Sequence, residues 1–274
     1  MSPRQAPVRD VAPTVQRLRL RYAKRGRLRF SSHRDFQRAF ERALRRAGVP
    51  MAYSQGFNPH PRVSYANSAP TGTASEAEYV EIAVTAVLDP EKVRLALDTA
   101  LPPGLDVIEV VASKTSDFIE RLEASVWEIE LPGVSVATAQ EAAESLMAAE
   151  EVMVERLTKN GIRTFDARGP VVAVEVDQVN GLAEPGGSLG DDSPEGGTRS
   201  AGELADCAIM RLVVRHVTPS VRPDDVLVAL RHVANLVPPV PVRVTRLAQG
   251  PLVADVNGQA AVDAVTDPFA ADRG

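Results

Sequence analysis

Two histidines in the first quarter of the chain are the side chains best suited to proton transfer or phosphate binding. His33 stands at the start of a predicted helix, and His60 lies between Pro59 and Pro61. The prolines restrict the backbone on both sides of His60, so its imidazole would be held rigidly. An imidazole has an unperturbed pKa of about 6.5 and can act as an acid or a base. The structural alternative is that His33 completes a helix cap and that His60 belongs to a turn.

Arginine side chains accompany both histidines. The helix expected over residues 32–47 carries four of them and a fifth follows the prolines: Arg34, Arg38, Arg42, Arg45 and Arg62. A planar guanidinium group forms paired hydrogen bonds with phosphate or carboxylate. We expect these five side chains to contribute to one positive patch. The alternative is an arginine-rich face that is merely solvated.

The distribution of charge favours an anion-facing surface. The chain has a net charge of −5. Residues 17–62 contain 13 Lys and Arg but only Asp35 and Glu41, a local charge of +11, so the remaining residues carry −16. Such an asymmetry indicates one surface for an anionic partner rather than a generally basic protein.

The segment SQGFNPHPRVSYANSAPTG, residues 54–72, follows a short strand expected near 51–53 and leads into one expected around 62–66, so it joins two strands at the edge of the basic surface. Phe57 and Tyr65 could stack on nucleic-acid bases, and the amide of Asn58 could contact a base or peptide edge. The alternatives are that Phe57 anchors the loop to the core and that Asn58 starts a turn. Because the prolines fix the backbone in advance, less conformational freedom is lost on binding. The segment is therefore predicted to be a recognition loop.

The residue types also exclude several kinds of chemistry. The single cysteine, Cys207, cannot form an intramolecular disulfide, and neither the GxGxxG nor the GxxxxGK[ST] phosphate loop occurs. Two histidines without a carboxylate at ligand spacing make a poor metal site. We therefore expect no cofactor and no bound metal.

The hydrophobic pattern predicts an α+β fold of two tandem ferredoxin-like domains, because a βαββαβ order occurs twice. The first domain is expected over residues 15–112, with a basic face, and the second over residues 121–250. Residues 1–14 read as a disordered leader, 180–202 as a flexible insertion and 255–274 as a tail. Under this division His33, His60 and the five arginines named above all belong to the first domain.

A cytoplasmic location is expected from the sequence. No apolar run approaches the roughly 20 residues of a membrane span, and the N-terminus lacks the apolar region of a signal peptide. One cysteine in 274 residues fits a reducing compartment. We expect no association with a membrane.

Three stretches carry a family resemblance: SHRDFQRAFERALRRAG, YSQGFNPHPRVSYA and PTGTASEAEY. Over roughly residues 16–210 the chain resembles the radical SAM-linked family, a bacterial domain of unknown function. The resemblance implies a radical SAM enzyme as partner. This chain cannot be that enzyme, because the cluster needs three cysteine ligands and the sequence has one cysteine.

A second resemblance is architectural. Tandem ferredoxin-like domains with a basic first helix resemble the RAMP superfamily of metal-independent endoribonucleases. That resemblance implies His60 or His33 as general acid or base on a ribose hydroxyl. The superfamily's glycine-rich loop near the C-terminus is not found in this sequence.

Three functions follow from these observations. The first is a non-catalytic accessory module that recognises RNA, either transfer or ribosomal RNA, for a separate radical SAM enzyme. The second is a RAMP-type endoribonuclease that uses His60 or His33. The third is a protein–protein docking domain whose arginine face binds an acidic patch on the radical SAM partner. For the first and third, the expected binding residues are Arg34, Arg38, Arg42, Arg45, Phe57, Asn58, His60, Arg62 and Tyr65.

Overall fold

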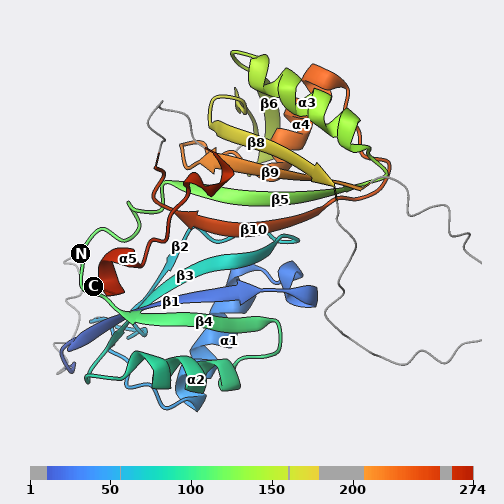
Figure 1. Cartoon of the computed structure of the whole chain (residues 1–274). Coiled ribbons are helices and arrows are strands. Elements are labelled where there is room, and N and C mark those ends of the chain that lie inside the picture. The colour runs from blue at the N-terminus through green and yellow to red at the C-terminus, as the bar shows by residue number, and fades with distance from the viewer. Residues whose placement is uncertain (1–10, 56, 160, 179–206, 254–260, 274) are drawn as a thin grey trace, which may run out of the picture. The chain divides into compact units, whose positions relative to one another are not determined.

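The computed structural model describes residues 11–55, 57–159, 161–178, 207–253 and 261–273. The insertion expected at 180–202 and most of the expected leader lie outside these residues. The chain forms two compact units (Figure 1), of which the first comprises Met1–Trp127 with Val244–Gly274 and the second Glu128–Arg243. The domain boundary expected between Ala112 and Arg121 lies inside the first unit.

The first unit is built on an antiparallel sheet with the strand order β4-β1-β3-β2. Its elements are β1 (Gln16–Lys24), the 3-10 helix η1 (Gly26–Phe30), α1 (His33–Arg46), β2 (Val63–Ala66), β3 (Ala74–Val84), α2 (Pro90–Ala100) and β4 (Leu105–Ala112). This is the split βαβ arrangement expected for the first half of the chain. Strand β10 (Arg243–Gly250) pairs in parallel with the first two residues of β3.

Helix α1 begins and ends at the residues that the sequence predicts. The Ser32 side chain accepts a hydrogen bond from the Asp35 backbone, and Asp35 bonds back to Ser32, which forms a capping box. Gly48 follows the helix with a φ of 65°, a conformation that glycine adopts without strain. The buried face of α1 contributes Phe36 and Phe40 to the core.

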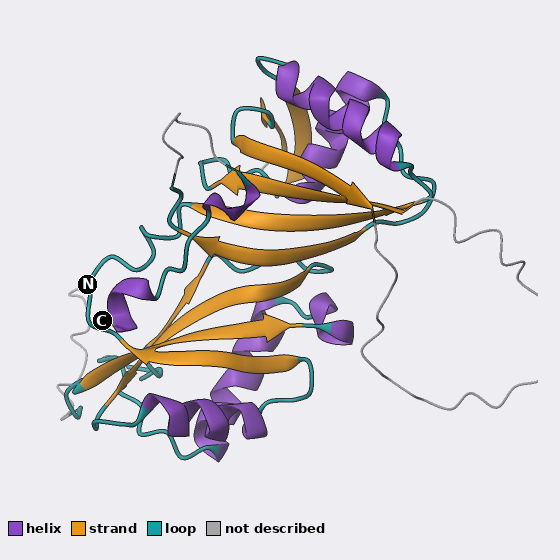
Figure 2. Cartoon of the chain, viewed as in Figure 1, coloured by secondary structure: helices purple, strands orange, loops and turns teal. Residues whose placement is uncertain are grey.

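Helices α1 and α2 cover one face of this sheet (Figure 2), and the main core lies between them and the strands. Alternating strand residues such as Leu18, Leu20 and Ile82 point into that core. The rings of Tyr22 and Phe36 stack with centroids 4.3 Å apart. The intervening strand residues, which include Arg17, Arg19 and Glu81, therefore lie on the opposite face.

The opposite face is covered by the segment after β4 and by the C-terminal segment, which contains η2 (Val262–Ala264) and α5 (Ala270–Arg273). Phe269 is fully buried, and its ring lies 5.2 Å from that of Tyr79 and 5.6 Å from that of Phe118. Residues 269–273 thus pack on the first unit, whereas the sequence predicted a tail from 255. Most apolar residues of the segment are alanine or valine, and Phe269, its one aromatic residue, packs against two aromatic rings.

The second unit contains most of β5 (Ala124–Pro132), which begins in the first unit. Its other elements are α3 (Val136–Ala148), β6 (Met153–Thr158), β7 (Gly161–Asp166), β8 (Val171–Gln178), β9 (Cys207–Arg215) and α4 (Pro223–Ala234). Strands β8 and β9 pair antiparallel, and β6 and β7 form a separate two-stranded sheet. The protein is therefore a mixed helix and strand structure, and a tandem ferredoxin-like repeat is not confirmed. Among the described helices none is long and apolar enough to cross a membrane.

Candidate functional site

Four exposed arginines form a stripe along α1: Arg34, Arg38, Arg42 and Arg45, called here the α1 arginine stripe. They follow one another at intervals of four, four and three residues, which places them within roughly 80° of the helix circumference. The buried residues Phe36 and Phe40 lie on the other side of the helix. Within the described residues no acidic group forms a salt bridge with any of the four. Four of the five arginines predicted to share a patch are thus together.

The one acidic residue in the first turn of α1 is engaged by the helix cap. The Asp35 carboxylate accepts hydrogen bonds from the Ser32 hydroxyl at 2.6 Å and the Ser32 backbone at 3.3 Å. These bonds, and then the charges of Arg38 and Arg34, lower the pKa of Asp35. The carboxylate stays ionised at the helix N-terminus, where it completes the cap.

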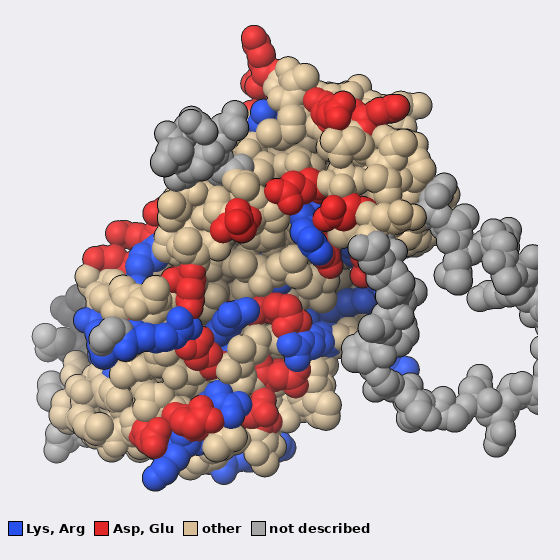
Figure 3. Space-filling model, viewed as in Figure 1, with Lys and Arg blue, Asp and Glu red and all other residues tan. Residues whose placement is uncertain are grey.

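Other basic residues of the 17–62 region are paired within the first unit. Arg17 and Arg19 bind Glu81, and Arg25 binds Glu76 and Asp106. The face drawn in Figure 3 accordingly shows basic and acidic side chains interspersed over the first unit. The local charge of +11 counted from the sequence is therefore partly neutralised by strands that follow later in the chain.

His33 lies beside the stripe, and both of its ring nitrogens are in contact with neighbours. Its Nε2 is 2.9 Å from Gln37 Nε2, and its Nδ1 is 3.0 Å from Ser68 Oγ. Because an amide nitrogen can only donate, His33 Nε2 must accept and Nδ1–H must donate to Ser68. The imidazole also packs edge-on against Tyr65, with centroids 5.0 Å apart. His33 thus ties α1 to the loop after β2, whereas the helix cap suggested for it is made by Ser32 and Asp35.

His60 lies on the exposed surface of the predicted recognition loop. Its backbone N–H donates to Ser54 Oγ at 3.0 Å, and its carbonyl accepts from the Ser54 backbone at 2.8 Å. Within the described residues, the structure gives the His60 imidazole no hydrogen-bond partner that could orient it as an acid or base. Phe57 and Asn58 are exposed on the same loop.

Tyr65 occupies a different place from the exposed stacking platform that the sequence suggested. Its ring faces α1, with its centroid 5.9 Å from that of Phe36 and 6.4 Å from that of Phe40. The hydroxyl is buried and has no hydrogen-bond partner among the residues that the structure describes, and burial raises the pKa of Tyr65. The alternation of β2 explains this, because Val63 and Tyr65 point to the helix-covered face.

Arg62 is separated from the α1 arginine stripe by the sheet. It is exposed and lines a hollow together with Arg17, Ser64 and Glu81, which lie on the face opposite α1. The expectation that Arg62 shares one patch with the helix arginines is therefore not met. The cause is the register of β2: Arg62, which directly precedes the strand, and Ser64 within it alternate with Val63 and Tyr65 and face away from the helices.

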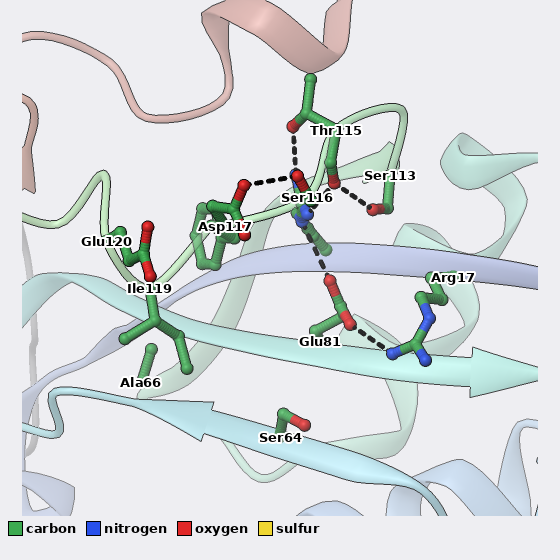
Figure 4. A pocket seen from close by; sticks show the side chains of 12 residues that line it. Arg17, Ser64, Ala66, Glu81, Ser113, Thr115, Ser116, Asp117, Ile119 and Glu120 are labelled. Atoms are coloured by element: carbon green, nitrogen blue, oxygen red, sulfur yellow. Dashed lines mark hydrogen bonds and ion pairs between the residues drawn. The ribbon is translucent and has the colours of Figure 1, made fainter.

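A pocket of about 510 Å³ lies on this second face (Figure 4). Its lining combines β1 and β3 residues, among them Arg17 and Glu81, with the segment after β4, which supplies Ser113, Asp117 and Ile119. The sequence analysis missed this pocket. The alternation of charged and apolar residues in β1 indicated a second face, but nothing local in the sequence indicated that residues 113–122 fold over it.

A comparison with known protein families finds a match that covers the site residues described above. Residues 17–223 match the family described as "Uncharacterized protein conserved in bacteria (DUF2344)". The match includes α1, the recognition loop and the residues that line the pocket. No curated protein matches the chain. Because the matched region spans more than half of the 274 residues, the chain belongs to this bacterial family.

Proposed function

We propose that this protein is a non-catalytic RNA-recognition module that works with a separate radical SAM enzyme. The α1 arginine stripe carries the proposal. Its guanidinium groups are exposed and form no salt bridge within the described residues, so a phosphate could bind without first displacing a protein carboxylate. Charge-assisted hydrogen bonds from arginine to phosphate are stronger than neutral ones and favour planar, paired geometry.

The length of the stripe favours a polyanion over a single small anion. Arg34 and Arg45 are eleven residues apart, which corresponds to about 16 Å along the helix axis. A nucleic-acid backbone presents phosphates over such a distance, whereas one small anion would contact one or two of the arginines.

The exposed side chains of the recognition loop support sequence-tolerant contacts beside phosphate binding. Phe57, Asn58 and His60 offer a ring, an amide and an imidazole on one short loop. Single-stranded RNA is commonly recognised by stacking and by hydrogen bonds to base edges. In this proposal the loop reads RNA, and transfer RNA is the first candidate.

The partner rests on the resemblance of the sequence to the radical SAM-linked family. A chain with one cysteine cannot hold the cluster, so radical chemistry must occur on another polypeptide. The endoribonuclease alternative is less well supported, because His33 has both nitrogens engaged and His60 has no described partner to orient it. The protein-docking alternative uses the same stripe and is separated from RNA binding by the experiment below.

We also propose that the second half of the chain repeats the first in its fold. The sheet neighbours β10-β5-β9-β8 follow the order 4-1-3-2 when β6 and β7 are set aside as an inserted ribbon. Helices α3 and α4 then occupy the two helical positions of a second βαββαβ unit.

The test is RNA binding by wild type and by a variant with all four stripe arginines changed to Gln. Fluorescence anisotropy with labelled bacterial transfer RNA should show at least about tenfold weaker binding for the variant. A triple variant, Lys92→Gln, Arg163→Gln and Arg231→Gln, removes exposed charges elsewhere and should bind like wild type. Incubation in EDTA should leave the RNA intact with every protein.

Three results would contradict the proposal. Equal affinity of wild type and the four-arginine variant would remove the stripe from the interface. Cleavage of RNA by wild type in EDTA would favour the endoribonuclease. Binding of the radical SAM enzyme through the stripe, without affinity for RNA, would favour the docking domain.

A further inference from the structure

The pocket in Figure 4 is a second candidate site, distinct from the α1 arginine stripe. It lies on the sheet face opposite α1, and a neighbouring hollow of about 440 Å³ shares Arg17, Ser64 and Glu81 with it. The two spaces therefore adjoin along β1, β2 and β3. The size of the pocket is within the range of about 300 to 1,000 Å³ that is typical of small-molecule sites.

Arg17 is held in place by a chain of ion pairs that leaves most of its donors available. Buried Arg19 donates from Nε to Glu81 Oε2 at 3.0 Å, and Arg17 donates from Nη1 to Glu81 Oε1 at 2.8 Å. Glu81 thereby uses both oxygens. A guanidinium group carries five N–H donors, so Arg17 has four left. Its side chain is 52% exposed, which makes those donors accessible to a ligand.

Arg62 adds a second guanidinium at the same end. It lines the adjoining hollow with Arg17, and the one hydrogen bond of its side chain among the described residues is a long one, 3.5 Å from Nη1 to Thr14 Oγ1. Arg17 and Arg62 together carry two positive charges, and Glu81 offsets one. This end of the pocket is therefore suited to an anionic group such as carboxylate or phosphate.

The other end of the pocket is acidic. Asp117 and Glu120 line the pocket but not the adjoining hollow, and Figure 4 shows them on the side away from Arg17. Asp117 has a φ of 59° and accepts a hydrogen bond from Ser116 Oγ at 2.5 Å, which orients its carboxylate. No described residue forms a salt bridge with either carboxylate. Ala66 and Ile119 supply apolar surface, and Figure 4 shows them on the same side of the pocket as Glu120.

We propose that this pocket binds a small dipolar molecule. Its carboxylate or phosphate group contacts Arg17 and Arg62, its ammonium group lies near Asp117 and Glu120, and the part of its apolar chain next to the ammonium group contacts Ala66 and Ile119. The site selects a ligand that carries a negative and a positive group at a suitable distance from each other, because each end alone offers only solvent-exposed ion pairs. Such pairs contribute little individually, so a ligand that satisfies both ends is preferred over one that satisfies either.

The test uses 6-aminohexanoate as the dipolar probe, with hexanoate and hexylammonium as single-ended controls. Titrations of the ¹⁵N-labelled full chain should shift amide signals of residues 62–66, 81 and 113–120. We expect the dipolar probe to bind about two- to fivefold more tightly than either control, the size of one exposed ion pair. The 6-aminohexyl phosphate of matching length distinguishes phosphate from carboxylate at the arginine end.

Variants assign the ends. Arg62→Gln should weaken the binding of 6-aminohexanoate and of hexanoate and leave the binding of hexylammonium unchanged. Glu120→Gln should weaken the binding of 6-aminohexanoate and of hexylammonium and leave the binding of hexanoate unchanged. Both residues are exposed, so the fold should be retained, which the unchanged amide spectrum of the core would show. Lys92→Gln on α2 is the matched control and should bind every probe like wild type. The proposal is overturned if no probe shifts the pocket signals, or if the two single-ended probes bind as tightly as the dipolar ones.

Discussion

Arg19 and Asp272 are 253 positions apart in the sequence and form a buried ion pair, with Arg19 Nη1 2.6 Å from Asp272 Oδ2. The pair joins the first strand of the sheet to the C-terminal turn α5. The same carboxylate accepts hydrogen bonds from the backbone of Lys114 and Thr115. Asp272 thus links α5 and the segment after β4 to strand β1, on the sheet face that bears the pocket.

Substitution of Asp272 should destabilise the protein strongly. Asp272→Asn keeps the size of the side chain but removes one of the two carboxylates that pair with buried Arg19, and breaking a buried ion pair typically costs about 3 to 5 kcal/mol. Chemical denaturation of the full chain measures this as a lower midpoint. Asp263→Asn, at an exposed position of the same segment, is the control and should change stability little. Equal stability of the two variants would contradict the role given to Asp272.

The stability contributed by Asp272 should depend on pH. Burial by itself would raise the pKa of this carboxyl, but hydrogen bonds from the Lys114 backbone and from Arg19 and other donors lower it to about 2. An unfolded Asp titrates near about 3.9, so the contribution is complete above that pH and is lost as pH falls toward 2. The stability gap between wild type and Asp272→Asn should narrow by about 2 kcal/mol from pH 6 to pH 2. A gap that does not change with pH would show that the pKa is not depressed.

Substitutions at Tyr65 test whether this residue packs in the core or contacts RNA. Tyr65→Phe removes a buried hydroxyl without a partner and should leave the free energy of unfolding unchanged or raise it by up to about 1 kcal/mol. Tyr65→Ala should lower it by roughly 2 to 4 kcal/mol, because the ring packs on α1. RNA affinity of Tyr65→Phe should equal that of wild type. Tighter or weaker RNA binding by this variant would indicate a direct contact with RNA.

The two histidines should respond differently to substitution. His60→Ala should weaken RNA binding by about 1 to 3 kcal/mol with no change in stability, because its imidazole is exposed on the recognition loop. His33→Ala loses the contacts with Gln37 and Ser68 and should instead lower stability by about 1 kcal/mol. Thermal unfolding and RNA anisotropy on both variants separate the effects. Reversed results would exchange the roles of the two residues.

The local elements of the first unit could be predicted from the sequence because their signals are local. Ser32 and Asp35 mark the start of α1, and alternation in residues 16–22 marks β1 with Leu18 and Leu20 in the core. The predicted positions of the four helix arginines follow from helix geometry alone. Each of these inferences needs only residues within a few positions of one another.

The remaining features depend on contacts between distant segments, which a local pattern does not contain. Arg62 was expected near the helix arginines because it is close in sequence, but the register of β2 places it on the other face. Arg17 and Arg19 were counted toward a positive surface, but in the structure they form ion pairs with Glu81 and Asp272, which are distant in the sequence. The C-terminal segment looked like a tail because one phenylalanine, Phe269, provides much of its burial.

The most direct test of the central claim is the salt dependence of RNA binding. Each phosphate contact should contribute about −0.7 to −0.9 to the slope of log affinity against log salt, so four arginine contacts predict a slope near −3. We expect this slope for wild type between about 50 and 200 mM salt. In the variant with Arg34, Arg38, Arg42 and Arg45 changed to Gln, the slope should move toward zero by about 3. A flat response in wild type, or the same slope in both proteins, would contradict the claim that the α1 arginine stripe binds RNA.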